Sequence, residues 1–317
     1  MNMDKELIGL LNKNYGINIV SVKTIERLMF RQSFLVQTIN KNRYVVKSYS
    51  CNYSIKELTL IWQYYWKLRN LGVEVGCPIR KINSKEFHLC IGDKYYVVFE
   101  YIEGLRPNTN QGKEIADCLR KYHEVASAGL LPELISTKQK IDRVEEQFEF
   151  FYYDDYILKQ EILSCERNMH EIVASYSGSG LTVIHGDTIL ENMVWNHNNV
   201  CLIDFDNIRC GDAIEDVANT VLSLIYYDSK EFKIHSERAG EVDFFLDCYY
   251  RNSYPLDIKE KIHYYMKVHC IVELVRYAEN IKYLIRMPTM KEYLLLLIKV
   301  INSKSFEMLI QEDNRNV

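Results

Sequence analysis

The chain has 317 residues, of which 48% are hydrophobic and 26% are charged, and its formal net charge is −4. This length and composition indicate a globular protein of two domains, and the weak negative charge excludes the basic surface with which proteins bind nucleic acids or anionic membranes. No apolar run reaches the roughly 20 residues that a membrane-spanning helix needs, and the N-terminus lacks a signal-peptide pattern, so we expect a cytoplasmic protein.

The first hundred residues predict a small sheet with two helices. A helix is expected at 4–14, from its apolar periodicity, and another at 53–70, ended by Leu71–Gly72. Short runs rich in Val, Ile and aromatic residues predict five strands between and after them. The predicted strands are 17–25, 34–39, 43–49, 86–91 and 94–102.

From Glu103 onward the pattern becomes mainly helical. The predicted helices are 114–127, 140–156, 217–227 and 259–285. Only the strand-like runs at 181–185, 192–196 and 200–205 interrupt them. We therefore expect an α+β protein with an N-terminal domain at 1–102, a hinge at its end, and a helical domain at 103–317.

Acidic and amide side chains gather in the segment VIHGDTILENMVWNHNNVCLIDFDNIRCGD, which begins at Val183. Asp187 follows one predicted strand, Asn192 begins the next, and Asp204 ends the third. A hairpin with its turn at NHNN would bring Asn192 and Asp204 together. Their oxygens suit Mg²⁺, and Asp187 could accept the proton of an attacking hydroxyl. A base, two metal ligands and a nucleotide phosphate are the parts that phosphoryl transfer needs.

The pattern H-G-D-x-x-x-x-N followed by I-D-F-D resembles the signature of the aminoglycoside phosphotransferase and choline kinase superfamily, and the chain is most similar in style to spore-coat CotS-like kinases. The resemblance implies a protein-kinase-like bilobal fold, with a small five-stranded antiparallel sheet lobe and a larger, mainly helical lobe. It implies that Asp187 is the catalytic residue and that Asn192 and Asp204 bind Mg²⁺.

Four neighbouring residues receive other roles. We expect His185 to be structural, bonded to backbone near Asp204. Asp206 could reach a second metal ion or could hold its loop. Asp212 is placed to cap the following helix, and Asp216 to brace the catalytic loop.

The resemblance also predicts the nucleotide site. Lys47, on the third strand, would bind the ATP phosphates, with Glu57 as its acidic partner. Residues 21–40 contain no glycine, so Arg31, Gln32 and Ser33 would supply the contacts that a glycine-rich loop makes in many kinases. The purine would contact the backbone of the hinge at Glu100 and Ile102.

The acceptor is expected to be a small molecule with a hydroxyl group. Two stretches combine acids with aromatic residues: EEQFEFFYYDDY, at 145–156, and EVDFFLDCYYRNSY, which contains Asp243 and Asp247. Such surfaces attract cations, which favours an amine-bearing alcohol or amino sugar. The alternative is that both stretches are amphipathic helices with ordinary solvated faces.

Three functions are compatible with these residues. The first is an ATP-dependent small-molecule kinase that uses Mg²⁺. The second is a catalytically silent structural protein of the spore coat with the same fold, which the missing glycines favour. The third is a kinase acting on a protein or polysaccharide hydroxyl.

Overall fold

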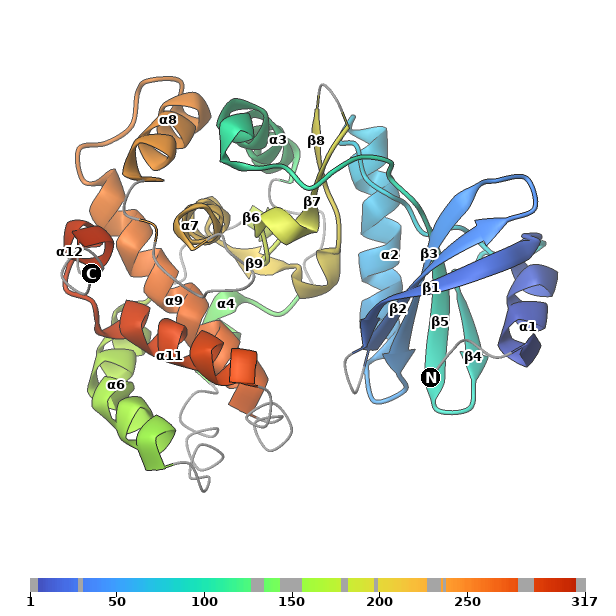
Figure 1. The fold of residues 1–317 in the computed structure, drawn as a ribbon, viewed down its shortest axis with the longest axis horizontal. Helices are drawn as coiled ribbons and strands as arrows, with labels where there is room; N and C mark the ends of the chain where they lie inside the picture. The colour runs from blue at the N-terminus through green and yellow to red at the C-terminus, as the bar shows by residue number, and fades with distance from the viewer. Residues whose placement is uncertain are drawn as a thin grey trace. The chain divides into compact units, whose positions relative to one another are not determined.

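The computed structural model describes residues 5–27, 31–126, 134–142, 156–177, 182–196, 199–226, 235, 238–278 and 288–311. The chain divides into two compact units, Met1–Gly104 and Leu105–Val317 (Figure 1). The sequence analysis placed this boundary after residue 102.

The first unit contains one five-stranded antiparallel sheet, as the sequence predicted. Its strands are β1 (Ile19–Arg27), β2 (Arg31–Thr38), β3 (Arg43–Ser50), β4 (His88–Ile91) and β5 (Lys94–Glu100), in the spatial order β1-β2-β3-β5-β4. Consecutive strands pair, except that β5 lies between β3 and β4. This order places β3, which carries Lys47, at the centre of the sheet.

Two helices, α1 (Lys5–Tyr15) and α2 (Ile55–Asn70), cover opposite faces of this sheet (Figure 1). Leu11 of α1 packs in one apolar cluster with Val46 of β3. On the other face, the ring of Trp62 in α2 lies 5.9 Å from that of Tyr49. Because side chains alternate along a strand, Lys47 lies on the same face as Tyr49, the face that α2 covers.

The second unit is mainly helical. Its helices are α3 (Gly112–Val125), α4 (Thr137–Ile141), α6 (Tyr156–Ser175), α7 (Ala213–Ile225), α8 (Ala239–Tyr250), α9 (Ile258–Ala278), α11 (Pro288–Asn302) and α12 (Phe306–Gln311). Its short strands are β6 (Thr182–Ile184), β7 (Met193–Trp195), β8 (Val200–Leu202) and β9 (Arg209–Gly211). Strand β6 pairs with β9 and β7 with β8, both antiparallel. Single 3₁₀ turns are η1 (Thr109–Gln111), η3 (Leu190–Asn192) and η4 (Phe205–Asn207).

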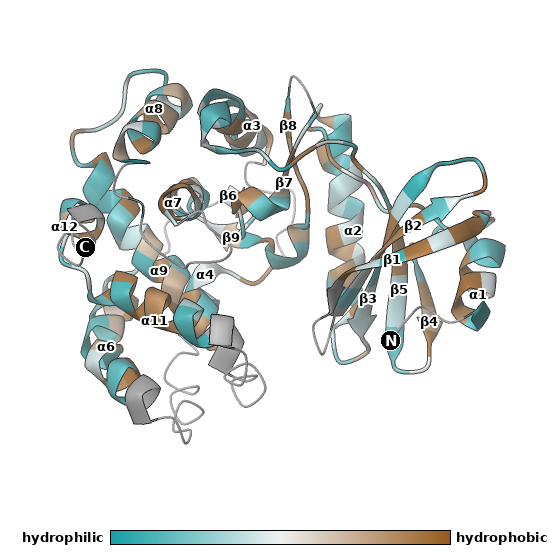
Figure 2. Cartoon of the chain, viewed as in Figure 1, coloured by the Kyte–Doolittle hydropathy of each residue, from teal (hydrophilic) through white to brown (hydrophobic). Residues whose placement is uncertain are grey.

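Helix α7 forms the centre of the second unit. Every residue from Glu215 to Ile225 is buried, and the helix contacts α3, α8, α9 and β6. Figure 2 shows it coloured largely as hydrophobic among helices whose outer sides are hydrophilic. The polar residues that α7 does carry, such as Asp216 and Thr220, are therefore enclosed in the core, where each needs a hydrogen-bond partner.

The helices α6, α8, α11 and α12 were not among the predicted helices, although an amphipathic helix was the alternative kept open for the stretch that covers most of α8. The helix predicted at 140–156 falls mostly on 143–155, which lie outside the described residues, and α4 ends at Ile141. Residues 279–285, the C-terminal part of the helix predicted at 259–285, also lie outside the described residues. None of the helices that the structure describes is both long and apolar enough to cross a membrane.

The packing of α1 on the sheet predicts the effect of truncating Leu11, which is fully buried. Leu11→Ala should lower the free energy of unfolding of the first unit by about 2–5 kcal/mol, because it removes apolar contacts and leaves a cavity. Denaturant unfolding measures this loss. Leu163→Ala, at a helical position that is 39% exposed, is the control and should lose less than about 1 kcal/mol; equal losses would contradict the packing described.

Candidate active site

The hairpin of β7 and β8 brings Asn192 next to the residue that precedes Asp204. Met193 lies opposite Leu202 in the ladder, and the N–H of Ile203 donates to the carbonyl of Asn192 at 2.9 Å. The hairpin predicted from the spacing of the two strands is thus confirmed. It places one amide and one carboxylate side chain on adjacent backbone segments.

Asp204 has a left-handed backbone, with φ 64° and ψ 61°. For a residue other than glycine this conformation costs on the order of 1 kcal/mol or more and is concentrated at functional sites. It turns the chain directly into η4. Phe205, the first residue of that turn, is fully buried, and its ring lies 4.4 Å from the ring of His185.

The side chain of His185 supports the same turn. Its Nε2 lies 2.9 Å from the carbonyl oxygen of Ile203, and the residue is fully buried. The prediction that His185 is structural and bonds backbone near Asp204 is confirmed.

The side-chain amide of Asn192 has a fixed orientation. Its Nδ2 donates to the backbone carbonyl of Asp187 at 2.9 Å. Since the nitrogen is directed at that carbonyl, the amide oxygen is directed elsewhere. Asn192 therefore holds the loop at Asp187 with its nitrogen and leaves its amide oxygen for another partner.

The carboxylate of Asp187 is also held in place. Its Oδ2 accepts a hydrogen bond from Nδ2 of Asn207 at 3.0 Å. The preceding residue, Gly186, has φ +77°, and a Cβ there would lie 2.0 Å from Nη1 of Arg209 and 2.5 Å from the carbonyl oxygen of Asn207. Only glycine fits this position, because both its conformation and its surroundings exclude a side chain.

Asp216 of α7 fixes the backbone that precedes Asp187. Its two carboxylate oxygens accept the N–H groups of His185 and Gly186, each at 2.8 Å. This confirms the predicted bracing role. Asp212 caps α7 as predicted, with its side chain accepting the N–H of Ile214 at 3.2 Å.

The carboxylate of Asp216 has a further partner in α3. Nε2 of His123 lies 3.1 Å from it, and Nδ1 of His123 lies 2.7 Å from the hydroxyl of Tyr249 in α8. Burial alone would raise the pKa of Asp216, but the hydrogen bond and the charge of His123 outweigh it, so its pKa is lowered. Burial raises the pKa of Tyr249, which keeps its hydroxyl protonated beside His123.

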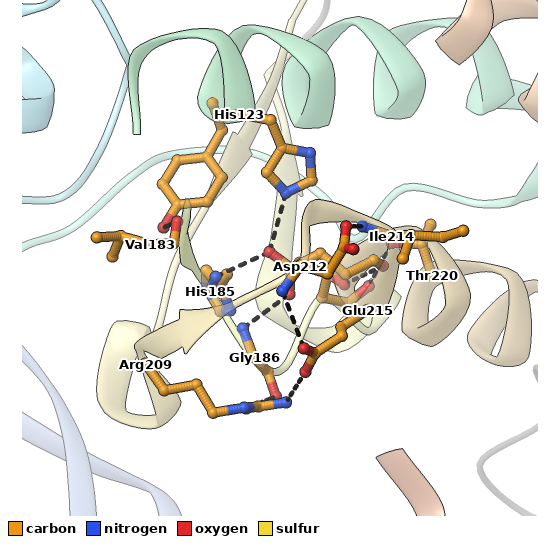
Figure 3. A network of polar contacts seen from close by, with 12 residues as sticks. His123, Val183, His185, Gly186, Arg209, Asp212, Ile214, Glu215 and Thr220 are labelled. Carbon is orange, nitrogen blue, oxygen red and sulfur yellow. Dashed lines mark hydrogen bonds and ion pairs between the residues drawn. The ribbon is translucent and has the colours of Figure 1, made fainter. Parts of the chain in front are cut away.

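A second buried network holds the other side of the loop. Nη1 of Arg209 donates to the carbonyl of Gly186 at 3.1 Å, and its Nη2 lies 3.3 Å from the carboxylate of Glu215 (Figure 3). Thr137 of α4 accepts from Nε of Arg209 at 2.8 Å and donates to Glu215 at 2.6 Å. The ion pair of Arg209 and Glu215 is 1% exposed on each side, so both charges depend on these partners.

Helix α7 also binds the part of the loop that follows Asp187. The hydroxyl of Thr188 donates to the carbonyl of Asp216 at 2.6 Å, and the carbonyl of Thr188 accepts from Thr220 at 3.0 Å. Farther on, the N–H of Leu190 donates to the hydroxyl of Ser223 at 3.0 Å. The segment from His185 to Leu190 is thus tied to one core helix at four residues.

In the first unit, Lys47 and Ser33 lie opposite each other on β3 and β2. Both are buried, at 8% and 6% exposure, and opposite residues of an antiparallel pair share one face. Nζ of Lys47 lies 5.5 Å from the centre of the Phe99 ring. Residues 28–30, between β1 and β2, and the side chain of Arg31 lie outside the described residues.

The structure does not pair Lys47 with Glu57. Glu57 lies in the first turn of α2, and its side chain is exposed. Its backbone N–H donates to the hydroxyl of Ser54, the N-cap of that helix, at 3.3 Å, and no ion pair joins its carboxylate to Lys47 among the described residues. The structure gives this predicted partnership no support, because α2 begins only two residues earlier and leaves Glu57 at the solvated end of the helix.

Glu100, at the predicted hinge, has a structural side chain. Its carboxylate forms an ion pair with Arg69 of α2 and accepts the N–H of Cys77 at 3.1 Å. The backbone N–H of Glu100 donates to the carbonyl of Cys77 at 3.0 Å. Ile102 follows β5 by two residues and is half-buried.

The two acidic stretches proposed for the acceptor differ in outcome. Residues 145–155 of the first lie outside the described part of the chain. In the second, Asp243 forms an ion pair with Lys259 at 2.6 Å, so its charge is compensated, whereas Asp247 lies half-buried on α8. Among the described residues no group of three or more His, Cys, Asp or Glu could hold a metal ion, so a metal site built on Asn192 and Asp204 needs further ligands from substrate or water.

Sequence reasoning missed His123, Asn207 and Arg209. A signal for His123 was available, because it occupies the apolar stripe of its helix, four residues after the fully buried Leu119. A polar residue at such a position must find a buried partner. Asn207 and Arg209 gave no comparable signal, since both contacts depend on the η4 turn.

The sequence profile of a family described as phosphotransferase enzyme family (APH) matches residues 24–240 of this chain. A search of curated protein sequences found no match.

Among solved structures, the chain is similar to an amicoumacin kinase in complex with AMP-PNP and Ca²⁺, with a TM-score of 0.74 and 13% identity over 96% of this chain and 95% of that one. A spectinomycin phosphotransferase in complex with ADP and its substrate gives a TM-score of 0.67 and 14% identity over 95% and 97%. A choline kinase from Streptococcus pneumoniae gives 0.62 and 18% over 95% and 99%. At these identities the likeness establishes the fold, which is kinase-like.

The enclosed carboxylate of Asp216 predicts a pH-dependent loss of stability. Asp216→Asn should lower the free energy of unfolding of the second unit by roughly 3–5 kcal/mol near pH 7, because it removes one partner of a buried charged network. The pKa of Asp216 is lowered in the folded protein, so its contribution is fully present above the unfolded pKa of about 3.9 and is lost as the pH falls through the folded value.

Denaturant unfolding at a series of pH values measures this difference between the unmodified protein and the variant. Asp117→Asn, at an exposed position paired with Arg120, is the matched control. A difference that stayed constant down to pH 3, or a loss equal to that of the control, would show that Asp216 does not carry the charge described.

Proposed function

Because the chain belongs to the phosphotransferase enzyme family, we propose that it is an ATP-dependent kinase that transfers the γ-phosphate to a hydroxyl group of a small molecule. The observation that carries this proposal is the held loop of the second unit. There Asn207 holds the carboxylate of Asp187, the amide of Asn192 binds the backbone of Asp187, and Asp204 has a left-handed backbone.

Asp187 is the proposed catalytic base. The acceptor oxygen attacks the γ-phosphorus, the bond from that phosphorus to the bridging oxygen breaks, and ADP leaves. The hydroxyl proton passes to the carboxylate of Asp187. Little covalent chemistry is asked of the protein in such a reaction, so most of its contribution is positioning.

The donor set of Asn192 and Asp204 fits Mg²⁺. One amide oxygen and one carboxylate are hard oxygen ligands, and Mg²⁺ in nucleotide sites takes one or two protein ligands and fills its shell with phosphate oxygens and water. Ca²⁺ in the nucleotide complex of the amicoumacin kinase supports a divalent cation in this fold. When bound, the cation would neutralise charge on the phosphates. Asp206, beside Asp204 in the η4 turn, stays a candidate for a second ion.

The nucleotide contacts are assigned to the first unit. Lys47 and Ser33, which face the same side of the sheet, would bind the phosphates. At the hinge, the N–H of Glu100 already donates to Cys77, so a purine would use the carbonyl oxygen of Glu100 and the backbone of Ile102. The complexes with AMP-PNP and ADP among the similar structures support ATP as the phosphate donor.

For the acceptor we propose an amine-bearing alcohol or an amino sugar. Asp247 of the second stretch lies on α8 without an ion pair among the described residues, and the similar structures include kinases of choline and spectinomycin. None of the similar proteins named above is a spore-coat protein, so the CotS-like likeness and a spore-coat association stay predictions. The presence of Lys47, Asp187, Asn192 and Asp204 together favours an active enzyme over a silent structural protein.

Binding of the nucleotide gives the first test. Millimolar Mg²⁺–ATP should raise the melting temperature, because a ligand that binds only the folded state stabilises it by about 2.7 kcal/mol at a hundred times its Kd. Lys47→Ala should reduce this rise, since it removes a cation from the phosphates. Lys23→Ala, on an exposed position of β1, is the control and should keep it. A melting temperature insensitive to nucleotide would favour the silent structural protein.

The base assignment gives the second test. Asp187→Asn should keep the thermal response to Mg²⁺–ATP but lower phosphate transfer by about 10²–10⁴-fold, the usual contribution of a general base. Transfer is measured with radiolabelled ATP and a panel of alcohols and amino sugars that includes choline and spectinomycin. Asp142→Asn, at an exposed position of an i,i+4 pair with Lys138, should transfer normally. Full turnover in the Asp187 variant would refute the assignment.

A further inference from the structure

We infer that Asn207 is a positioning residue for Asp187: its amide N–H holds the carboxylate in one orientation and ties the base to the turn that presents Asp204. This inference rests on the proposed function and adds to it a residue that no sequence motif singled out. The direct observation is the hydrogen bond from Nδ2 of Asn207 to Oδ2 of Asp187, at 3.0 Å.

The turn that carries Asn207 is built by its neighbours. The left-handed backbone of Asp204 starts η4, and the buried Phe205 anchors it against His185. The N–H of Ile208 donates back to the carbonyl of Phe205 at 3.3 Å and closes the turn. Asn207 is therefore the last residue of a single, well-anchored turn that begins directly after Asp204.

One guanidinium joins this turn to the base loop. Nη1 of Arg209 donates both to the carbonyl of Asn207, at 3.3 Å, and to the carbonyl of Gly186, at 3.1 Å. The backbones on either side of the contact between Asn207 and Asp187 are thus held by the same buried nitrogen. The absence of a side chain at Gly186 permits this approach.

The chemistry of an amide suits this task. A carboxylate can rotate about its Cβ–Cγ bond, and a donor on one oxygen fixes the plane of the group. A lysine or arginine in the same place would bring a full positive charge to the base and weaken its attraction for a proton, whereas the neutral amide orients the carboxylate without compensating its charge.

This role depends on the N–H of residue 207 and not on its shape, which makes a sharp comparison available. Asn207→Asp keeps the shape but replaces the donor with a carboxylate that repels Asp187. Asn207→Ala removes the donor without adding charge. If Asn207 orients the base, the aspartate variant must be the worse of the two; if the side chain only fills space, it must be the better.

The experiment measures ATP consumption and phosphate transfer with choline, spectinomycin or water as the acceptor. Asn207→Ala should lower kcat about 10- to 100-fold, the usual effect of losing a hydrogen bond to a charged group, with KM for ATP unchanged within about twofold because a positioning contact acts in the transition state. Asn207→Asp should lower kcat further. In an Asp187→Asn background, Asn207→Ala should have no added effect.

The matched control is Asn168→Ala, which removes another side-chain amide donor, bonded to Asn302 at 2.8 Å, and should leave kcat unchanged. If the unmodified protein transfers phosphate and Asn207→Asp is as active as Asn207→Ala or more so, the inference is wrong while the proposed function stands. If the unmodified protein consumes no ATP with any of these acceptors, the proposed function fails and the inference fails with it.

Discussion

The carboxylate of Asp216 is the constraint on which the arrangement of the second unit depends. It is enclosed in the core helix α7 and receives N–H groups from His185, Gly186 and His123. An ionised group without solvent is tolerated only when such donors converge on it. Because two of the three donors are backbone groups of the loop, the need to satisfy this one charge fixes where the loop runs.

Other side chains bind the carbonyl groups of the same loop. Arg209 binds the carbonyl of Gly186, and Asn192 binds the carbonyl of Asp187. Donors therefore meet the loop carbonyls while an acceptor meets the loop amides. Protein side chains thus bind both the N–H and the carbonyl groups of the loop backbone. A site built in this way needs little reorganisation when a substrate binds. A surface loop of the same length would have water as its partner.

The sequence predicted those parts of the fold that local patterns determine. Short runs rich in Val, Ile and aromatic residues predicted the five strands of the first unit. The strand-like runs at Asn192 and Asp204 predicted the hairpin of the second unit that brings these two residues together. The predicted pairing of Lys47 with Glu57 finds no support in the structure, since closeness in sequence does not determine whether a helix end faces the sheet or the solvent. The contacts of Asn207 could not be predicted, because they follow from the left-handed backbone of Asp204. An aspartate in a sequence does not by itself predict that conformation. Helix α6 was missed for a related reason: charged residues interrupt its apolar stripe, and its stability comes from packing.

The turn between β2 and β3 has a consequence for how this chain can vary. It spans only Ile39 to Asn42, is closed by a hydrogen bond of 2.9 Å from the N–H of Thr38 to the carbonyl of Asn42, and passes through a left-handed Lys41. Side-chain direction alternates along β3, so a one-residue insertion or deletion that shifted the register would carry Lys47 to the face covered by α1 and Val46 to the face covered by α2. A change in length that shifts the register by an odd number of residues is therefore excluded. Relatives that keep the lysine on this face can lengthen the connection only by an even number of residues or by adding a compensating bulge.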